Sequence, residues 1–197
     1  MQALERKHPT LPARPGLVER IEFEYVRHGT LCLIANWDVA AGRIREATIG
    51  PTRTEQDFLA HIRTTVDTDP NATWIFVADQ LCTHVSESLV RFVAERCALQ
   101  VDLGAKSKQG ILKSRKSRRA FLSDPSHRIR FVYTPRHCSW LNQIEIWFSI
   151  LVRRRLKRGS FPSVEDLQER LLAFIRYFNR ALAKPFKWTY TGRPLQA

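Results

Sequence analysis

The stretch TWIFVAD, residues 73–79, decides the fold. It is a short, uninterrupted apolar run that ends in an acid, Asp79. A run of this length predicts a strand buried on both faces, in the middle of a sheet that helices cover. Reacting groups gather at the carboxyl ends of central strands in open α/β sheets, so Asp79 is a candidate site residue. The alternative is that its carboxylate only caps the following turn.

Strands are also expected upstream of this run. Residues 22–29 and 30–50 are rich in β-forming residues and break at His28-Gly29 and Ala41-Gly42, which predicts strands in hairpin connection. The chain start carries Pro9, Pro12, Pro15 and Gly16 and is expected to be an irregular arm.

Helices are predicted from periodicity and capping residues. Thr54 begins one helix, with Phe58, Ile62 and Val66 on one face, and a second begins near Ser86, with Leu89, Phe92 and Val93 on one side. After a strand at residues 128–134, Ser139 is expected to cap a helix that runs to about Arg155, and Ser163 to cap the last one. Strands followed by alternating helices and strands predict one α/β domain over residues 1–197, a mixed sheet flanked by helices.

The charge points to a polyanionic partner. The chain of 197 residues has 32 Lys and Arg against 19 Asp and Glu, a net charge of +13. Seven of the fourteen residues at 106–119 are basic and none is acidic, which predicts a basic loop or a loosely helical arm inserted at about 102–127. No apolar run is long enough to span a bilayer, so we expect DNA rather than a membrane as the partner.

Zinc and disulfide chemistry are not expected. Cys32, Cys82, Cys97 and Cys138 lie far apart and form no Cys-x-x-Cys pair. His127 and His137 also lack the spacing of zinc ligands. Four separate cysteines suit the reducing cytosol, and the chain start has no secretory signal.

Glu145 is the second candidate acid. It lies in TPRHCSWLNQIEIWF, residues 134–148, on the border of the apolar face that Ile144, Trp147 and Leu151 form. A solvated or salt-bridged carboxylate is the alternative there. Together with Asp79 it can bind Mg²⁺ or Mn²⁺, which prefer oxygen ligands, and two such ions about 4 Å apart cleave phosphodiesters. That chemistry needs at least one further carboxylate.

These residues lie in segments that resemble a known family. VADQLCTH, RIRFVYTPRHCSWLNQIEIWF, KRGSFPSVEDL and FIRYFNRALAKPFKWTYTGRPL are similar to the catalytic domain of bacterial mariner-like insertion-sequence transposases, the group numbered six-thirty. The resemblance implies a ribonuclease H-like fold and a DDE site, in which three acids hold two Mg²⁺ or Mn²⁺ ions that cut DNA and join its ends to a target. Asp79 matches the second acid and Glu145 the third, while Gln80 and His84 match polar residues that orient the acid or touch DNA. A cap on the next helix is the alternative for His84.

Two departures from the family accompany the resemblance. The family's first acid ends a strand just before the segment that Met1 begins, so we expect the first, central strand, its acid and the helix-turn-helix region to be missing. Asp38 is a weak substitute, because it matches a turn-side aspartate. In addition, 65 residues lie between Asp79 and Glu145, about twice the family's usual separation, because of the basic insertion.

A sheet without its central strand has two unpaired inner edges. We therefore expect either a marginally stable chain or a gap that residues 20–26 or the arm partly fill.

The expected function is that of a transposase catalytic domain, metal-dependent DNA cleavage and strand transfer. This chain is expected to be an incomplete copy that is inactive alone, and the alternative is a catalytically inactive DNA-binding fragment. DNA, at transposon ends and target, is the expected partner; the resemblance also allows a homodimer, and we expect a cytoplasmic, nucleoid-associated protein. The residues expected to bind DNA are Lys106, Lys108, Lys113, Arg115, Lys116, Arg118, Arg119, Trp140, Asn142, Arg153, Arg154, Arg155, Lys157 and Arg158.

Overall fold

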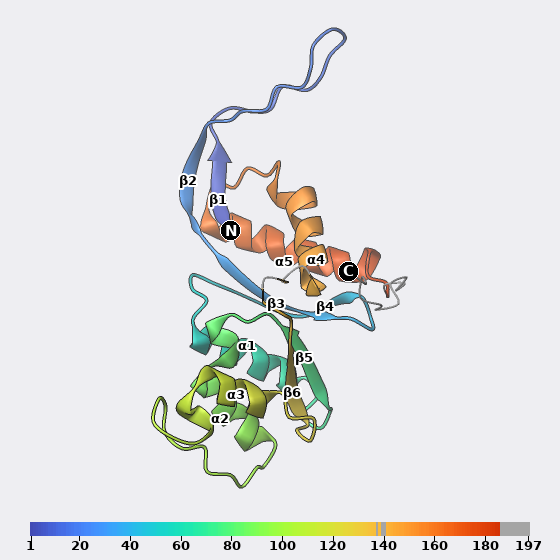
Figure 1. Ribbon diagram of the computed structural model, residues 1–197. Coiled ribbons are helices and arrows are strands. Elements are labelled where there is room, and N and C mark those ends of the chain that lie inside the picture. Colours follow the sequence, from blue (N-terminus) through green and yellow to red (C-terminus); the bar gives the residue numbers. More distant parts are fainter. Residues whose placement is uncertain (137, 139–140, 186–197) are drawn as a thin grey trace, which may run out of the picture.

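The computed structural model describes residues 1–136, 138 and 141–185, and its elements form two packed groups on either side of one hairpin (Figure 1). The strands are β1 (Gln2–Arg6), β2 (Tyr25–Thr30), β3 (Cys32–Asp38), β4 (Arg43–Gly50), β5 (Trp74–Ala78) and β6 (Ile129–Tyr133). The helices are α1 (Glu55–Asp67), α2 (Glu87–Arg96), α3 (Arg115–Leu122), α4 (Ile144–Leu151) and α5 (Val164–Ala181), with short helical turns η1 (Cys82–Val85), η2 (Ile111–Lys113) and η4 (Val152–Leu156).

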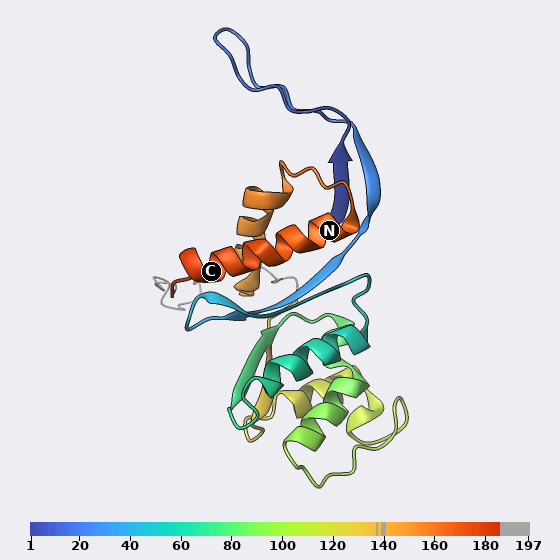
Figure 2. The same ribbon diagram turned by 180° about the vertical axis from the view of Figure 1, so that it is seen from behind.

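The β-strands pair two by two in the part of the chain that the structure describes. β1 is antiparallel to β2, β3 is antiparallel to β4, and β5 is parallel to β6. We call α1, β5, α2, α3 and β6 the α1–α3 half, and β1, β2, α4 and α5 the α4–α5 half. The β3–β4 hairpin lies between the two halves (Figures 1 and 2). The structure is therefore mixed α/β with small sheets, where the sequence predicted one larger mixed sheet.

The start of the chain is more regular than predicted. Gln2–Arg6 forms a strand, and residues 7–24 then project from the body as a long loop (Figure 2). The predicted break at His28-Gly29 is wrong, because β2 runs through it and only Leu31 separates β2 from β3. The backbone N–H and C=O of Met1 both bond to Leu31, which aligns β1 with the start of β3. The arm thus pairs with β2 and not with β5.

The hairpin predicted at Ala41-Gly42 is confirmed. β3 and β4 pair antiparallel across this turn, where Gly42 has φ +65° and donates its N–H to the Asp38 carbonyl at 2.8 Å. A Cβ at Gly42 would lie 1.9 Å from the Lys184 carbonyl oxygen, so glycine is needed for both conformation and space. Asp38 Oδ1 accepts a hydrogen bond from Ala41 N at 2.9 Å. Its carboxylate therefore stabilises the hairpin turn, as its match to a turn-side aspartate predicted.

The α1–α3 half contains the predicted helices α1 and α2. Thr54 and Asp57 form a reciprocal capping box at the start of α1, and Ser86 caps α2 by accepting from Leu89 N at 3.3 Å. The apolar faces predicted for both helices are buried. They share a core with residues of β5 and β6, of which Phe92 and Phe131 are the largest buried side chains.

The basic insertion is folded, where a loop or a loosely helical arm was predicted. A capping box of Ser114 and Ser117 begins α3, and the insertion contributes the fully buried side chains of Leu112 and Leu122 to the core of this half. These two leucines lie on either side of the run Lys113–Arg119, in η2 and at the end of α3. Burial of these leucines stabilises the helix, because each fully buried Leu contributes about 1.5–3 kcal/mol.

The expectation that β5 is buried on both faces is wrong. Ile75 and Val77 are 51% and 50% exposed, while Phe76 and Ala78 pack against the core. The helices α1, α2 and α3 cover only one face of the β5–β6 pair, as Figure 1 shows. The unbroken apolar run predicts burial on both faces, but the side chains of β5 alternate between buried and exposed, as in a strand with one covered face.

The α4–α5 half has its own core. Ser163 caps α5 by accepting from Asp166 N at 3.0 Å, as predicted. Trp147, Leu151 and Phe174 are buried between α4 and α5, and Leu33, Ala35 and Trp37 of β3 pack against this core from the hairpin.

The helix after β6 begins at Ile144, and the predicted cap Ser139 lies outside the described residues. All four cysteines are free, and no described helix is long and apolar enough to cross a bilayer.

Candidate active site

Asp79 follows directly after β5, where the strand ends and the chain turns into η1. Its Oδ1 accepts a hydrogen bond from Leu81 N at 3.0 Å and lies 2.8 Å from Nδ1 of His84. The side chain is 41% exposed, so an external cation can reach it. The alternative that Asp79 caps the turn is therefore confirmed for one oxygen, and the carboxylate is still accessible to solvent.

His84 is held in position from three sides. Its ring packs on Phe58 with the centroids 4.3 Å apart, and its carbonyl oxygen accepts a hydrogen bond from the Tyr133 hydroxyl at 2.8 Å. Burial raises the pKa of the Tyr133 phenol, which therefore stays protonated and donates. Since Ser86 caps α2, the capping alternative for His84 is wrong. The imidazole lies against the Asp79 carboxylate and is suited to orient it.

Gln80 points toward the strand beside β5. Its Nε2 donates to the carbonyl oxygen of Thr134 at 2.7 Å, and the Thr134 N–H donates to the Ala78 carbonyl at 3.0 Å. These bonds tie the ends of β5 and β6 together at the point where Asp79 leaves the sheet. Gln80 therefore helps to fix the backbone at the strand end from which the Asp79 side chain projects.

Glu145 is in the first turn of α4 and is exposed. Within the described residues its carboxylate makes no hydrogen bond or ion pair, so the salt-bridged alternative has no partner there. The backbone beneath it is fixed by Trp147, which is fully buried and packs on Phe148, Phe174 and Phe178 at centroid distances of 5.5, 6.2 and 6.2 Å. The helix is anchored by aromatic side chains while the acid stays free.

Asp79 and Glu145 border the same cleft. This cleft has a volume of about 1030 Å³ and lies between the halves, with Asn142 on its wall, and the whole of β3 and β5 also lines it. Asp38 borders it as well, although its Oδ1 is engaged in the hairpin turn. β3 and β5 pair only with β4 and β6 in the described chain, so both keep an unpaired edge. Folding brings the two predicted acids, which have 65 residues between them in the sequence, to one cavity.

The donors of this cleft fit a divalent metal in kind. Asp79 and Glu145 offer hard carboxylate oxygens, which Mg²⁺ and Mn²⁺ prefer. Across residues 1–136, 138 and 141–185, however, no group of three or more His, Cys, Asp or Glu is placed to hold a metal ion. Asp38 and Asp69 also line the cleft, and Asp79 and Glu145 are the two ligands that the sequence predicted. No third ligand is grouped with them among the described residues.

The predicted DNA-binding residues divide into separate places. Arg115, Lys116 and Arg119 of α3 line a second hollow, which also borders Asp79. Lys106 instead pairs with Glu87 at 3.8 Å. Lys108, Lys113 and Arg118 belong to the same insertion but do not line this hollow, and Trp140 lies outside the described residues.

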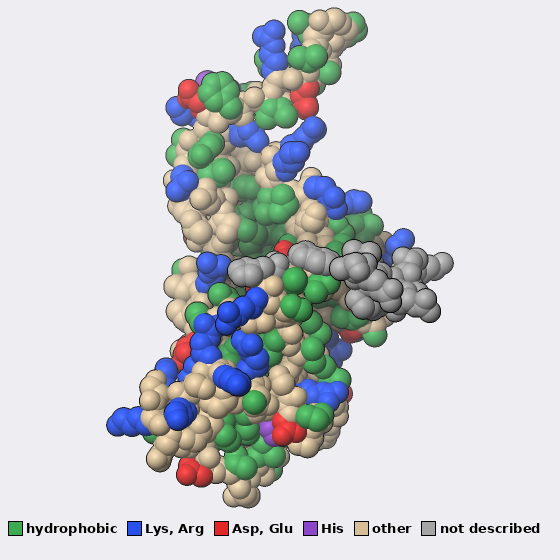
Figure 3. Space-filling model, in the orientation of Figure 1, with side chains coloured by type: hydrophobic (Ala, Val, Ile, Leu, Met, Phe, Trp, Pro, Cys, Tyr) green, Lys and Arg blue, Asp and Glu red, His purple; other side chains and the backbone are tan. Residues whose placement is uncertain are grey.

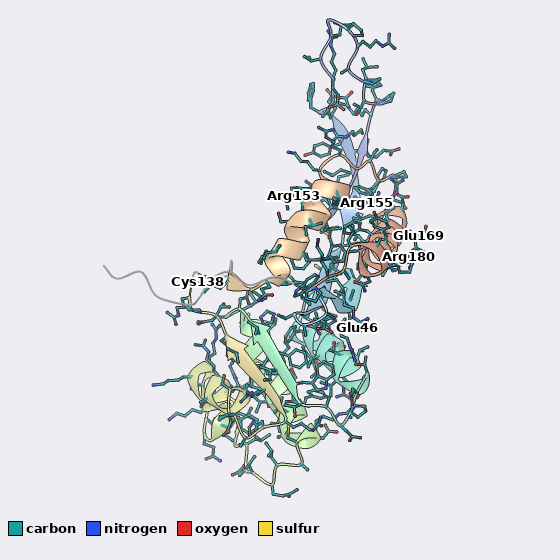
Figure 4. The ribbon with its side chains drawn as sticks, turned by 90° about the vertical axis from the view of Figure 1, so that its right-hand side faces the viewer. Glu46, Cys138, Arg153, Arg155, Glu169 and Arg180 are labelled. Atoms are coloured by element: carbon teal, nitrogen blue, oxygen red, sulfur yellow. The ribbon has the colours of Figure 1, made fainter. Side chains whose placement is uncertain are left out.

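The second basic run lies in the other half of the molecule. Arg153, Arg154 and Arg155 belong to η4 at the end of α4, followed by Lys157 and Arg158, and Figure 4 shows Arg153 and Arg155 on that side. The guanidinium of Arg155 lies 5.5 Å from the centre of the Phe174 ring, and Arg158 pairs with Glu19 at 3.6 Å. None of these five residues lines the cleft or the hollow. They form a patch of their own.

One basic residue of the hollow was missed from the sequence. Arg136 follows β6 and lines the hollow beside Arg119. It is a single Arg outside both basic runs, so charge clustering did not select it. Its place after a strand parallel to β5 was the available signal, because the ends of parallel neighbours meet at one edge of a sheet.

Comparison with known proteins gives one match. A family model described as DDE superfamily endonuclease matches residues 2–168. Neither a curated protein nor a solved structure matches the chain.

Proposed function

The chain belongs to the DDE superfamily endonucleases, and from this premise we propose that it is the catalytic domain of a DNA transposase of the mariner-like insertion-sequence type. Its substrates are the transposon ends and the target DNA, and it works in the bacterial cytoplasm at the nucleoid, in a form that can be dimeric. The single observation that carries the proposal is that Asp79 and Glu145 border one cleft.

In this proposal Asp79 and Glu145 are metal ligands. They would hold Mg²⁺ or Mn²⁺, which when bound would supply activation of the attacking hydroxyl and stabilisation of the leaving oxygen. His84 orients the Asp79 carboxylate through the 2.8 Å contact, and Gln80 holds the strand end below it. Asn142, on the wall of the same cleft, is placed to touch the DNA near the cut.

We further propose that the sheet becomes ribonuclease H-like when an additional strand enters between β3 and β5. Support comes from the unpaired edges of these two strands, both of which line the cleft, and from the exposed apolar side chains Ile75 and Val77 beside it. Such a strand would run on into β1, because Met1 already bonds to Leu31 at the start of β3. By the family resemblance it would bring the third acid.

The proposal is tested on two proteins, the chain itself and a version extended before Met1 by an apolar strand that ends in Asp-Glu, each incubated with labelled transposon-end DNA and Mg²⁺ or Mn²⁺. Nicking that disappears in Asp79→Asn and in Glu145→Gln supports it, and Asp38→Asn is the matched control that should retain cleavage. Because no three acids among the described residues are placed to hold a metal ion, we expect cleavage from the extended version and little or none from the chain itself. Cleavage unaffected by either carboxamide variant contradicts the assignment.

The alternative is a DNA-binding fragment without catalysis. The observation that favours it is that no group of three or more His, Cys, Asp or Glu among the described residues is placed to hold a metal ion. Salt-sensitive DNA binding, with no cleavage by the chain or by its strand-extended version, would select this function.

A further inference from the structure

The hollow beside Asp79 is a strongly basic surface. It has a volume of about 1070 Å³, and its lining includes Arg115, Lys116 and Arg119 of α3 together with Arg136 after β6. Figure 3 shows Lys and Arg side chains gathered over the region of α3. Asp79 is the only acid among the lining residues, so the hollow carries positive charge up to the edge of the candidate active site.

These basic side chains are presented by a rigid helix. Ser117 N donates to Ser114 Oγ at 3.1 Å, Ser114 N donates to Ser117 Oγ at 3.0 Å, and Leu122 at the other end of α3 is fully buried. Arg115 Nη2 donates to the Gln80 carbonyl at 2.9 Å, next to Asp79. The guanidinium of Arg119 lies 5.4 Å from the centre of the Tyr133 ring. Two of the charges are thus held in place by neutral partners.

Their charge is not neutralised within the structure. Arg115, Lys116, Arg119 and Arg136 form no ion pair with any described carboxylate, whereas Lys106, Arg91 and Arg96 nearby all do. Four uncompensated cations around one hollow create a positive potential that favours a polyanion. The first turn of α3 adds to it, since the amino-terminal end of a helix dipole also favours negative charge.

We propose that this hollow, the α3 groove, binds the phosphate backbone of DNA and leads it to Asp79. The inference rests on the proposed function and adds the path of the substrate. Arg115 and Arg119 lie one turn apart on α3, so they can contact phosphates along one strand, while Arg136 holds the backbone from the β6 side. The rest of the insertion's charge and the η4 patch contribute nonspecific attraction.

The experiment measures DNA affinity against salt concentration in EDTA, with the variant Arg115→Ala/Lys116→Ala. Removing two phosphate contacts should lower the slope of log K against log salt by about 2 and weaken binding about tenfold or more at low salt. The matched control is Lys108→Ala/Lys113→Ala, which removes the same charge from the same insertion outside the groove. We expect it to weaken binding less than threefold.

A second variant guards against a change in folding. Lys116→Glu breaks no described contact, and it should weaken binding at least as much as the loss of one phosphate contact. The proposal is wrong if the groove and control variants lose the same affinity for DNA, or if the slope of log K against log salt is unchanged in the groove variant. The binding assay contains no metal, so its result does not depend on whether the chain cleaves DNA. If the chain is inactive but needs the α3 groove for binding, only the catalytic proposal is refuted.

Discussion

The two halves of the molecule hold their candidate acids in different ways. In the α1–α3 half, Asp79 leaves a strand end and is fixed by Leu81 N and His84, within hydrogen-bond distance of both. In the α4–α5 half, Glu145 has no side-chain partner among the described residues, and the apolar packing of Trp147 and Leu151 fixes the helix beneath it. One acid is positioned by polar contacts and the other by the packing of its helix.

This difference has a consequence for the cleft. Its two walls belong to separate cores, with the β3–β4 hairpin between them. The distance between Asp79 and Glu145 therefore depends on how the halves pack, and not on either core alone. A segment that fills the cleft between β3 and β5 should therefore fix the positions of Asp79 and Glu145 at the same time.

The largest effect is expected from truncating one aromatic side chain in each core. Phe92→Ala in the α1–α3 half and Trp147→Ala in the α4–α5 half should each lower the free energy of unfolding by about 3–5 kcal/mol, because both side chains are almost completely buried. Urea unfolding followed by circular dichroism measures the loss. Two transitions, each shifted by only one variant, would show that the halves unfold separately.

The control for this pair is Tyr177→Ala, at a side chain of α5 that is 38% exposed. It should cost clearly less than either core variant. A Trp147→Ala protein as stable as the parent would refute the anchoring of α4.

The next effect is a pH dependence located in the α1–α3 half. Burial lowers the pKa of His61 to about 4, from 6.5, and the ring lies 2.9 Å from Thr48 Oγ1. Between these two pH values the unfolded chain binds a proton that the folded chain does not, so stability falls as the pH falls from 6.5 to 4. The loss is about 3 kcal/mol.

Unfolding measured at several pH values from 7 to 4 tests this prediction. His61→Gln cannot take up the proton, so the fall in stability relative to pH 7 should be smaller by that amount. Identical pH profiles for the parent and His61→Gln would show that the imidazole is not responsible.

The smallest effect compares one helix cap from each half. Ser114 caps α3 in a reciprocal capping box, and Ser163 caps α5 through Asp166 N. Each Ser→Ala substitution should cost about 1 kcal/mol. Only Ser114→Ala should also weaken DNA binding, because α3 carries the groove. Thermal unfolding and the binding assay check both points.

Ser149→Ala on α4 is the control, since this serine is exposed and its side chain makes no hydrogen bond with the described residues. It should change stability by less than about 0.5 kcal/mol. If Ser163→Ala weakened DNA binding as much as Ser114→Ala, the special role of α3 would fail.

Local patterns foretold most of the elements. The caps at Thr54, Ser86 and Ser163 and the apolar faces of α1 and α2 were predicted because capping and amphipathic spacing depend on residues within a few positions. The insertion was misread because seven basic residues masked Leu112 and Leu122, whose burial depends on a core formed by distant segments. β5 was misread because an apolar run does not reveal which of its faces a helix covers.

The amino-acid order alone settled the starts of α1, α2 and α5, the turn at Gly42, the positive charge and the two candidate acids, since each depends on short-range chemistry. Tertiary structure alone decided that the strands pair two by two, that Asp79 and Glu145 share a cleft, and that Arg136 joins α3 around one hollow. The reason is physical: side chains far apart in the chain meet only through packing, and packing energy depends on the whole shape of the core.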